Sequence, residues 1–178
     1  LNVLIDSEAE IIIVLDRFLE ELEPIINQTK LKHIIVCDVI DLLNPLMKFV
    51  VKVALTIKGP KIKRLKSTYI KFSDAIKYEK KPNKILLNRE DIALLQYTGG
   101  TTGKSKAAVL THGNLLSNIE QLSIWIEKSI EIGKESIVTA LPLYHIFSLT
   151  VNFFYFFSIG SKNILITNPR DLKSFIKT

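Results

Sequence analysis

The residues best suited to chemistry lie between 96 and 114, in the stretch QYTGGTTGKSKAAVLTHGN. Three glycines, Gly99, Gly100 and Gly103, are interspersed there with threonines, and two lysines follow them. Glycines let several backbone N–H groups converge on one anion, and lysines add positive charge at the same place. The composition of this stretch therefore predicts a loop that binds a polyphosphate.

The tail Gly103-Lys104-Ser105 is similar to the end of a Walker phosphate-binding loop, but the rest of the stretch does not fit that motif. A Walker loop has a glycine five positions before its second glycine, where this chain has Thr98, and it opens directly into a helix. Here an apolar run typical of a strand follows the lysines. A glycine hairpin without a ligand stays open as the simpler alternative, although it does not require three threonines and two lysines.

The elements that must position this loop are two strands and a helix. Apolar runs predict strands at 91–98 and 107–111, on either side of the loop. Thr111 is expected to cap a helix that ends near Gly133. The helix has one apolar face, which consists of Leu115, Ile119, Leu122, Ile126 and Ile130.

The remaining pattern alternates strands and helices, which predicts an α/β fold with a layered sheet and flanking helices. Strands are expected at 10–15, 33–37, 136–141 and 162–167, and helices at 16–29, 45–59, 141–160 and from Pro169 onward. The first three elements of the chain predict a βαβ unit with parallel strands. The basic, polar segment 60–84 is expected to be an exposed connection. Segment 45–59 fits either a solvated surface helix or a helix that lies on a membrane.

Composition excludes several classes of protein. The chain has 178 residues, a net charge of +6 and a single cysteine, Cys37, so no internal disulfide framework is expected. The basic residues lack the interleaved aromatic residues of a nucleic-acid site, and no nucleic-acid partner is predicted. Polar residues such as His145 interrupt the apolar stretch 141–160, which favours a buried helix over a membrane span. The first residue is not methionine, and we expect an internal piece of a longer protein.

Two stretches together resemble the signatures of the adenylate-forming superfamily, which includes acyl-CoA synthetases, luciferases and peptide-synthetase adenylation domains. The first is YTGGTTGKSKAAVLTHGNL at 97–115, and the second is TALPLYHIFSLTVN at 139–152. With NILITNPRDLKSFIK at 163–177, the sequence is similar to bacterial long-chain fatty-acid–CoA ligases along its whole length. The resemblance implies that residues 1–178 are part of the large N-terminal AMP-binding domain and that the C-terminal domain is absent.

The resemblance also implies roles for individual residues. His145 is expected to position the substrate where the nucleotide and acyl sites meet, and Phe147 with the cluster Phe153–Phe157 to line an acyl tunnel. Thr98 is expected to touch Mg²⁺, no catalytic residue is expected within the chain, and His112 and Asn114 are expected to cap the following helix. The expected ATP-binding residues are Tyr97, Thr98, Gly99, Gly100, Thr101, Thr102, Gly103, Lys104, Ser105, Lys106, Ala107 and Ala108.

The chain departs from the family pattern at two positions. Ser105 stands where the family usually has proline, and Ala107 stands where it usually has glycine. If position 107 needs a positive φ, the added Cβ costs about 1 kcal/mol and the positioning of the loop is in doubt.

The reaction implied by the resemblance uses ATP, a long-chain fatty acid and CoA as substrates, with Mg²⁺. The fatty acid is activated to acyl-AMP and then forms a thioester with CoA. A cytoplasmic location is expected, and a peripheral contact with the inner face of the membrane and a homodimer stay open. The alternatives are a truncated, non-catalytic remnant and an adenylate-forming ligase with a different acyl substrate or acceptor.

Overall fold

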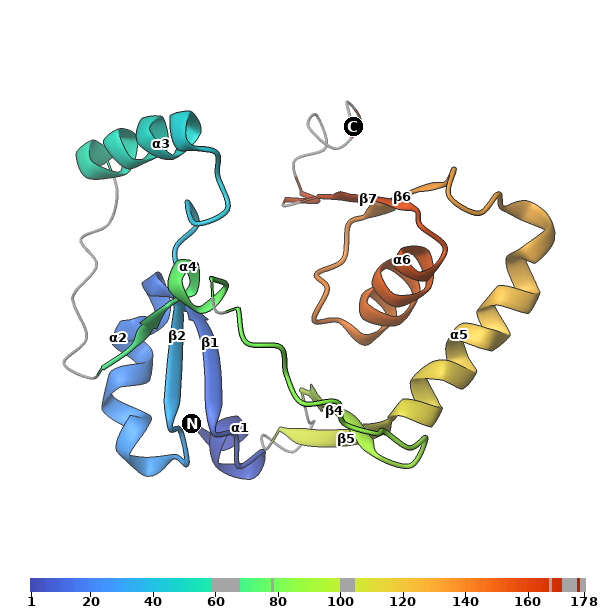
Figure 1. The fold of residues 1–178 in the computed structure, drawn as a ribbon, viewed down its shortest axis with the longest axis horizontal. Helices are drawn as coiled ribbons and strands as arrows, with labels where there is room; N and C mark the ends of the chain where they lie inside the picture. Colours follow the sequence, from blue (N-terminus) through green and yellow to red (C-terminus); the bar gives the residue numbers. More distant parts are fainter. Residues whose placement is uncertain (59–67, 78, 100–104, 167, 171–175, 177–178) are drawn as a thin grey trace. The chain divides into compact units, whose positions relative to one another are not determined.

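The structure is a computed structural model that describes residues 1–58, 68–77, 79–99, 105–166, 168–170 and 176 (Figure 1). The chain divides into two compact units, Leu1–Lys84 and Ile85–Thr178. The described residues form an α/β structure with three small sheets, one in the first unit and two in the second.

The first unit is built on a parallel sheet with the strand order β1-β2-β3. Strand β1 (Ile11–Leu15) pairs with β2 (His33–Cys37), which also pairs with β3 (Ile70–Lys71). The parallel βαβ unit predicted at 10–37 is therefore confirmed, and α1 (Asn2–Asp6) precedes it.

The connection between β1 and β2 is not the single helix predicted at 16–29. It consists of three short pieces, η1 (Asp16–Phe18), α2 (Leu19–Leu22) and η2 (Glu23–Gln28). Pro24 lies in the first turn of η2, and its ring supplies no N–H for a regular helical hydrogen bond, so the helix changes type there.

The core of the first unit forms between α2 and β2. Leu19 and Leu22 from α2 pack with Ile34 and Val36 from β2, and all four side chains are buried. Ile34 and Val36 are two residues apart, so they point to the same face of the strand. Each such side chain stabilises the fold by roughly 1.5–3 kcal/mol through removal of apolar surface from water.

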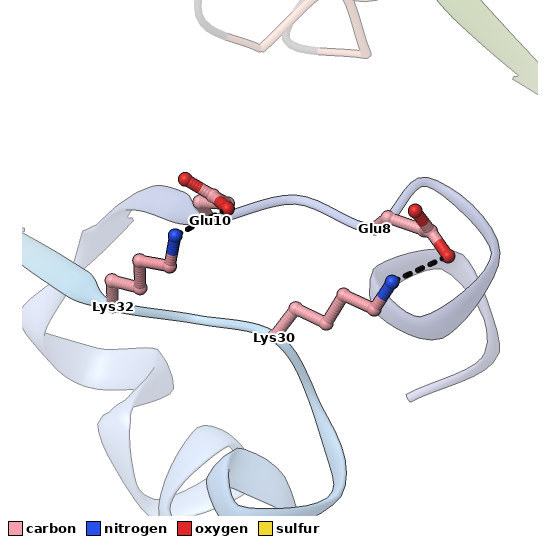
Figure 2. Close-up of polar contacts among 4 residues, drawn as sticks. All are labelled: Glu8, Glu10, Lys30 and Lys32. Carbon is pink, nitrogen blue, oxygen red and sulfur yellow. Dashed lines mark hydrogen bonds and ion pairs between the residues drawn. The ribbon is translucent and has the colours of Figure 1, made fainter.

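Two ion pairs lie where the chain enters β1 and β2 (Figure 2). The Lys30 ammonium lies 2.6 Å from Glu8 Oε1, and the Lys32 ammonium lies 2.5 Å from Glu10 Oε1. The hydrogen bond and the charge of Lys32 hold the pKa of Glu10 below its usual value. The four side chains are exposed, so these pairs help to orient the strand ends and add little to stability.

The helix predicted at 45–59 is confirmed as α3 (Pro45–Lys58). The exposed connection predicted at 60–84 is only partly correct, because residues 70–75 form β3 and the short helix α4 (Phe72–Ala75). Two residues of strand are too short to produce a period in the sequence, and pairing with β2 is what makes them a strand. Residues 59–67 and 78 of this segment lie outside the described residues.

The second unit begins with an antiparallel hairpin of β4 (Ile92–Thr98) and β5 (Lys106–Thr111), as predicted. Helix α5 (His112–Ile126) follows β5 directly and ends earlier than predicted, with η3 (Glu127–Ser129) after it. Gly133 has a φ of +77° and belongs instead to the turn before β6. The predicted apolar face of α5 is confirmed for Leu115, which is buried, and for Ile119, Leu122 and Ile126, which are partly buried. Ile130 is also partly buried but lies beyond the helix, in extended backbone after η3.

A second parallel pair consists of β6 (Ser136–Thr139) and β7 (Lys162–Leu165). Between them lie a π-helical segment, η4 (Ser148–Tyr155), and α6 (Phe156–Ser158). The strand predicted at 136–141 is shorter than expected, and the helix predicted at 141–160 starts later, because Pro142 and a turn separate them. The helix predicted from Pro169 falls largely outside the described residues.

The polar residues of this apolar stretch are hydrogen-bonded inside the unit. Ser148 Oγ donates to Leu141 O at 2.9 Å, and Thr150 Oγ1 donates to Ile146 O. Asn152 Nδ2 donates to Thr139 Oγ1 at 3.1 Å. Ser148, Thr150 and Asn152 are buried, whereas Phe147, Phe153 and Phe157 are exposed, so the predicted buried helix is buried on one face only. Within the described part of the chain no helix is long and apolar enough to cross a membrane.

Candidate functional site

The predicted phosphate loop connects the two strands of the β4–β5 hairpin. Thr98 is the last residue of β4 and pairs with Lys106, the first residue of β5. The Thr98 hydroxyl donates to Lys106 O at 3.4 Å, which closes the base of the loop. The arrangement is strand–loop–strand, so the rejection of a Walker loop is confirmed by the fold around it.

The hairpin register sorts the flanking side chains into two faces. Directly paired residues of an antiparallel hairpin share a face, and successive residues alternate. Thr98 and Lys106 therefore lie on the same face as the pair Gln96 and Ala108, whereas Tyr97 and Ala107 lie on the other. Thr98 and Lys106 are exposed, so a hydroxyl and an ammonium group are available on one face at the base of the loop.

The turn that carries His145 is hydrogen-bonded to this face. Gln96 Nε2 donates to the backbone oxygen of Tyr144 at 3.2 Å and to Tyr97 O at 3.3 Å. The His145 N–H donates to Pro142 O at 2.9 Å, which closes the turn before the helix. The structure thus brings the phosphate-loop strand and the second signature together, and the His145 side chain is exposed.

Hydrogen bonds to protein atoms already occupy the first N–H groups of α5. Thr111 Oγ1 accepts from the Asn114 N–H at 3.2 Å, and the Asn114 side chain accepts from the Thr111 N–H at 3.0 Å, which forms a capping box. The His112 N–H donates to Asp91 O at 3.0 Å. The predicted cap at Thr111 and the capping role of Asn114 are confirmed, whereas His112 takes part through its backbone. These amides are therefore not free to bind a phosphate.

Gly113 fixes how closely the start of α5 approaches the chain before β4. Its N–H donates to Arg89 O at 2.7 Å, and a Cβ at this position would lie 3.0 Å from the same oxygen. The Arg89 side chain also reaches α5, donating to Ser117 Oγ at 3.1 Å. Glycine is therefore needed here for close packing, which anchors the helix to the segment that leads into β4.

An apolar pocket of about 280 Å³ lies beside the hairpin. Side chains from β4, α5 and η4 line it, among them Leu94, Leu115, Ile119 and Phe154. Phe153 and Phe157 stack at a centroid distance of 5.5 Å, and Phe157 is 69% exposed. Of the predicted acyl-tunnel cluster, Phe154 lines the pocket, and Phe147 and Phe157 are exposed.

The structure describes only some of the predicted ATP-binding residues. Gly100, Thr101, Thr102, Gly103 and Lys104 lie outside the described residues. The described ones lie on the hairpin, where Tyr97 and Ala107 are partly buried and the rest, Thr98, Gly99, Ser105, Lys106 and Ala108, are exposed.

The departure from the family pattern at Ala107 causes no backbone strain. Ala107 lies in β5 paired with Tyr97, and among the described non-glycine residues only Glu8 has a positive φ. The conformation of this position is extended, which any residue adopts. The condition for a strain cost at Ala107 is therefore not met.

Sequence reasoning missed Gln96 as a site residue. It is the first residue of the stretch 96–114 but lies one position before the family signature at 97–115, and its side chain joins two segments that are far apart in the sequence. The only available signal was a polar residue at the end of an otherwise apolar strand, IALLQYT. Such a residue is expected to find a hydrogen-bond partner when it is partly buried.

A metal site is not assembled by the described residues alone. Among them, no cluster of three or more His, Cys, Asp or Glu side chains could hold a metal ion. The exposed Thr98 hydroxyl is the nearest fit to the predicted Mg²⁺ contact, as a neutral oxygen donor. Proteins usually hold Mg²⁺ through carboxylates and substrate phosphates together with water, so Thr98 would be at most one of several ligands.

Comparison with known proteins shows similarity to AMP-binding enzymes along nearly the whole chain. The sequence model of the family described as "AMP-binding enzyme" matches residues 6–178. A long-chain-fatty-acid–CoA ligase from Escherichia coli O157:H7 is 42% identical over 97% of this chain and 31% of its own length. A ligase of the same name from Bacillus subtilis is 41% identical over 43% of this chain and 13% of its own. The chain thus spans about a third of the length of the first of these relatives.

Solved structures share the fold. A long-chain-fatty-acid-CoA ligase from Archaeoglobus fulgidus aligns over 96% of this chain and 28% of its own, with a TM-score of 0.59 and 21% identity. ATP-bound MatB from Rhodopseudomonas palustris aligns over 89% of this chain and 30% of its own, with a TM-score of 0.52 and 23% identity. At these identities the likeness concerns the fold alone.

Proposed function

This chain belongs to the family of AMP-binding enzymes, and we propose that it is the segment of a long-chain fatty-acid–CoA ligase that holds the phosphates of ATP. The observation that carries the proposal is the convergence of both signatures on one face of the β4–β5 hairpin, through the hydrogen bond from Gln96 to Tyr144 O. The proposed reaction is ATP-dependent formation of acyl-AMP, followed by transfer of the acyl group to the CoA thiol.

In the first step the fatty carboxylate attacks the α-phosphorus of ATP, the bond to the bridging oxygen breaks, and pyrophosphate leaves. The carboxylate becomes a mixed anhydride with AMP, which is a far better acyl donor. In the second step the thiol of CoA displaces AMP, and the thiol proton passes to solvent. Positioning and charge neutralisation are what the protein contributes to the first step.

The residues of this segment would contribute mainly to binding the β- and γ-phosphates. We propose that backbone N–H groups and hydroxyls of Thr98–Gly103 contact these phosphates, with Lys104 and Lys106 adding positive charge. Tyr97, Ser105, Ala107 and Ala108 would frame the loop as parts of the hairpin and its end. Support comes from the hairpin, which places the exposed Thr98 and Lys106 side by side at the base of the loop.

Mg²⁺ would enter this site with the phosphates of ATP and would neutralise part of their charge. The Thr98 hydroxyl is the oxygen that this segment offers to the ion. We place no catalytic residue in residues 1–178.

The acyl chain is proposed to start at the turn of His145 and to enter the apolar pocket beside α5. The pocket volume, about 280 Å³, lies just below the range of roughly 300–1,000 Å³ that is typical of small-molecule sites. Its lining by Leu115, Ile119 and Phe154 suits a hydrocarbon. His145, exposed at the start of the helix, would orient the carboxylate end.

A long-chain fatty acid dissolves in membranes. We therefore propose that the enzyme is cytoplasmic and contacts the inner face of the membrane. This is a proposal about the whole protein, and the chain described here covers part of such an enzyme.

The test is fatty-acid-dependent exchange of labelled pyrophosphate into ATP by the full-length protein that carries this segment. The change Thr101→Ala removes a loop hydroxyl and is expected to lower kcat/KM by about 10- to 100-fold, because each lost contact to the reacting phosphates costs a few kcal/mol at most. The matched control is Thr68→Ala, at an exposed threonine of the first unit, which is expected to leave exchange unchanged.

Exchange that occurs without a fatty acid, or an equal effect of the two alanine variants, would contradict the proposal. The absence of exchange with any acid would favour a non-catalytic remnant. If a short or an aromatic acid supports exchange better than palmitate does, the protein is an adenylate-forming ligase with a different acyl substrate.

A further inference from the structure

His145 depends on its backbone for its position. Its side chain is exposed and has no hydrogen-bond partner among the residues that the structure describes. The His145 N–H donates to Pro142 O and the Leu149 N–H donates to His145 O, both at 2.9 Å, which gives the turn its shape. The bond from Gln96 to Tyr144 O ties the turn to the hairpin at one point. A turn held at one point can pivot, so further contacts have to decide where His145 lies.

Two side-chain hydrogen bonds bridge this turn, one inside the other. Ser148 Oγ, at the start of η4, donates to Leu141 O at 2.9 Å. Asn152 Nδ2, farther along η4, donates to Thr139 Oγ1 at the end of β6 at 3.1 Å. The inner bond joins positions seven apart and the outer bond positions thirteen apart, and His145 lies between the partners of both. We call these two bonds the turn clamp.

A closed ring of hydrogen bonds holds the outer bond of the turn clamp. Thr139 Oγ1 donates to Asn163 Oδ1 at 2.7 Å, and Asn163 Nδ2 donates to Asn152 O at 2.8 Å. The outer clamp bond, from Asn152 back to Thr139, completes the ring. Asn163 lies in β7, so the ring joins β6, β7 and η4. Thr139 is 2% exposed and Asn152 7%, and each member of the ring both donates and accepts, as buried polar groups require.

Packing alone does not call for polar side chains at these positions. The segment around η4 buries Ser148 and Asn152 and leaves Phe147 and Phe153 exposed, whereas an ordinary surface helix buries its apolar side. Apolar side chains of similar shape, in place of both partners of a buried hydrogen bond, can be nearly neutral for stability. What the polar groups add is direction, because a satisfied network of hydrogen bonds allows one arrangement of its members.

We propose that the turn clamp and its ring hold His145 in the place from which it orients the carboxylate of the fatty acid. Thr139 is the central positioning residue, because its hydroxyl makes two of the three bonds in the ring, as donor to Asn163 and as acceptor from Asn152. None of these side chains has to touch the substrate. The inference rests on the proposed function for the role of His145, whereas the holding of the turn is measurable without any activity.

The test uses variants of the full-length protein that remove one bond of the turn clamp at a time. Thr139→Val keeps the shape of the side chain and loses the hydroxyl, and Thr139→Ser keeps the hydroxyl. Ser148→Ala removes the inner bond, and it decides the matter if Thr139→Val does not fold. The matched control is Thr150→Val, since the Thr150 hydroxyl is buried in the same helix but donates to Ile146 O, on its own side of the turn.

The first measurement is hydrogen–deuterium exchange of the backbone amides of residues 141–149, read by mass spectrometry. Thr139→Val and Ser148→Ala are expected to speed this amide exchange on the order of five-fold, because loss of a hydrogen bond makes local opening easier. Thr139→Ser and Thr150→Val are expected to stay close to the wild type. Unchanged amide exchange in both clamp variants would overturn the proposal, and so would an equal acceleration in the Thr150→Val control.

The second measurement is fatty-acid-dependent pyrophosphate exchange at varied concentrations of fatty acid and ATP. Both clamp variants are expected to lower kcat/KM for the fatty acid on the order of five-fold and to leave the KM for ATP unchanged, because the ATP phosphates are proposed to bind at the hairpin loop. A lower melting temperature with unchanged kinetics would show a purely structural role and would overturn the proposal. A wild type without fatty-acid-dependent pyrophosphate exchange would refute the proposed function instead, and the amide exchange would still decide whether the turn clamp holds the turn.

Discussion

The side-chain amide of Gln96 joins the strand that enters the phosphate loop to the turn that carries His145. The family resemblance implied that His145 lies where the nucleotide and acyl sites meet, but no residue pattern indicated that the Gln96 side chain would bond to the Tyr144 oxygen. Partners that lie 48 positions apart in the sequence become visible only when the chain is folded. The glycines, threonines and lysines of the loop were predictable because their types alone suit an anion.

Replacement of Gln96 by leucine is expected to affect the reaction more than the fold. A hydrogen bond of this kind contributes about 1 kcal/mol, so kcat/KM for pyrophosphate exchange should fall on the order of five-fold in Gln96→Leu. The control Gln121→Leu removes an exposed amide from α5 and should leave exchange unchanged. A lower melting temperature with the same kcat/KM per folded molecule would show that Gln96 has only a structural role.

Asp16 is expected to reduce stability at neutral pH. Burial raises the pKa of its carboxyl, the nearby charges of Asp38 and Asp41 raise it further, and the Arg17 N–H opposes them. Because the folded-state pKa is above the unfolded value of about 3.9, the folded state binds the proton more tightly. Stability therefore falls as the pH rises from the unfolded pKa through the folded pKa of Asp16.

The variant Asp16→Asn keeps the acceptor for the Arg17 N–H and removes the charge. Urea unfolding should therefore give a larger free energy of unfolding for Asp16→Asn than for the wild type at pH 7, and the difference should disappear below the unfolded pKa. A variant that is less stable at pH 7 would show that the carboxylate has a favourable partner in the folded state.

At the scale of elements, predictions from long, regular sequence patterns were correct, whereas predictions from short or interrupted patterns were not. The amphipathic period of α5 and its capping residue predicted the start and the buried face of the helix. Segment 16–29 has a similar period but contains Pro24, and it breaks into three pieces. The two-residue strand β3 is too short to show a sequence period, and it is defined by its pairing with β2. The π-helical form of η4 has no sequence pattern of its own either, and buried side-chain hydrogen bonds accompany it.

The capping box at the start of α5 offers a direct test at this scale. In Thr111→Ala the Asn114 N–H loses its side-chain acceptor, and the free energy of unfolding should fall by about 1 kcal/mol. Thr111→Ser keeps the hydroxyl and should recover most of this loss in the same urea titration. Equal destabilisation by serine and alanine would mean that the methyl group of Thr111, and not the cap, contributes the stability.

At the scale of the whole molecule, the elements around the predicted phosphate loop all belong to one of the two units. The hairpin, α5 and the His145 turn lie in Ile85–Thr178, and α3 lies in Leu1–Lys84. The fold class and the family could be predicted from the sequence because two signatures occur in it at a wide separation. The exposure of apolar side chains on α3 could not, because a helical period alone does not show which side of the helix turns towards the protein.

The proposed function requires that this hairpin loop serve an AMP-forming reaction on a fatty acid. The most direct measurement is the identity of the products when the full-length protein is incubated with ATP and palmitate in the absence of CoA. We predict palmitoyl-AMP and pyrophosphate, and conversion of the bound palmitoyl-AMP to palmitoyl-CoA and AMP once CoA is added. The release of ADP and inorganic phosphate in place of AMP and pyrophosphate would rule out an AMP-forming ligase.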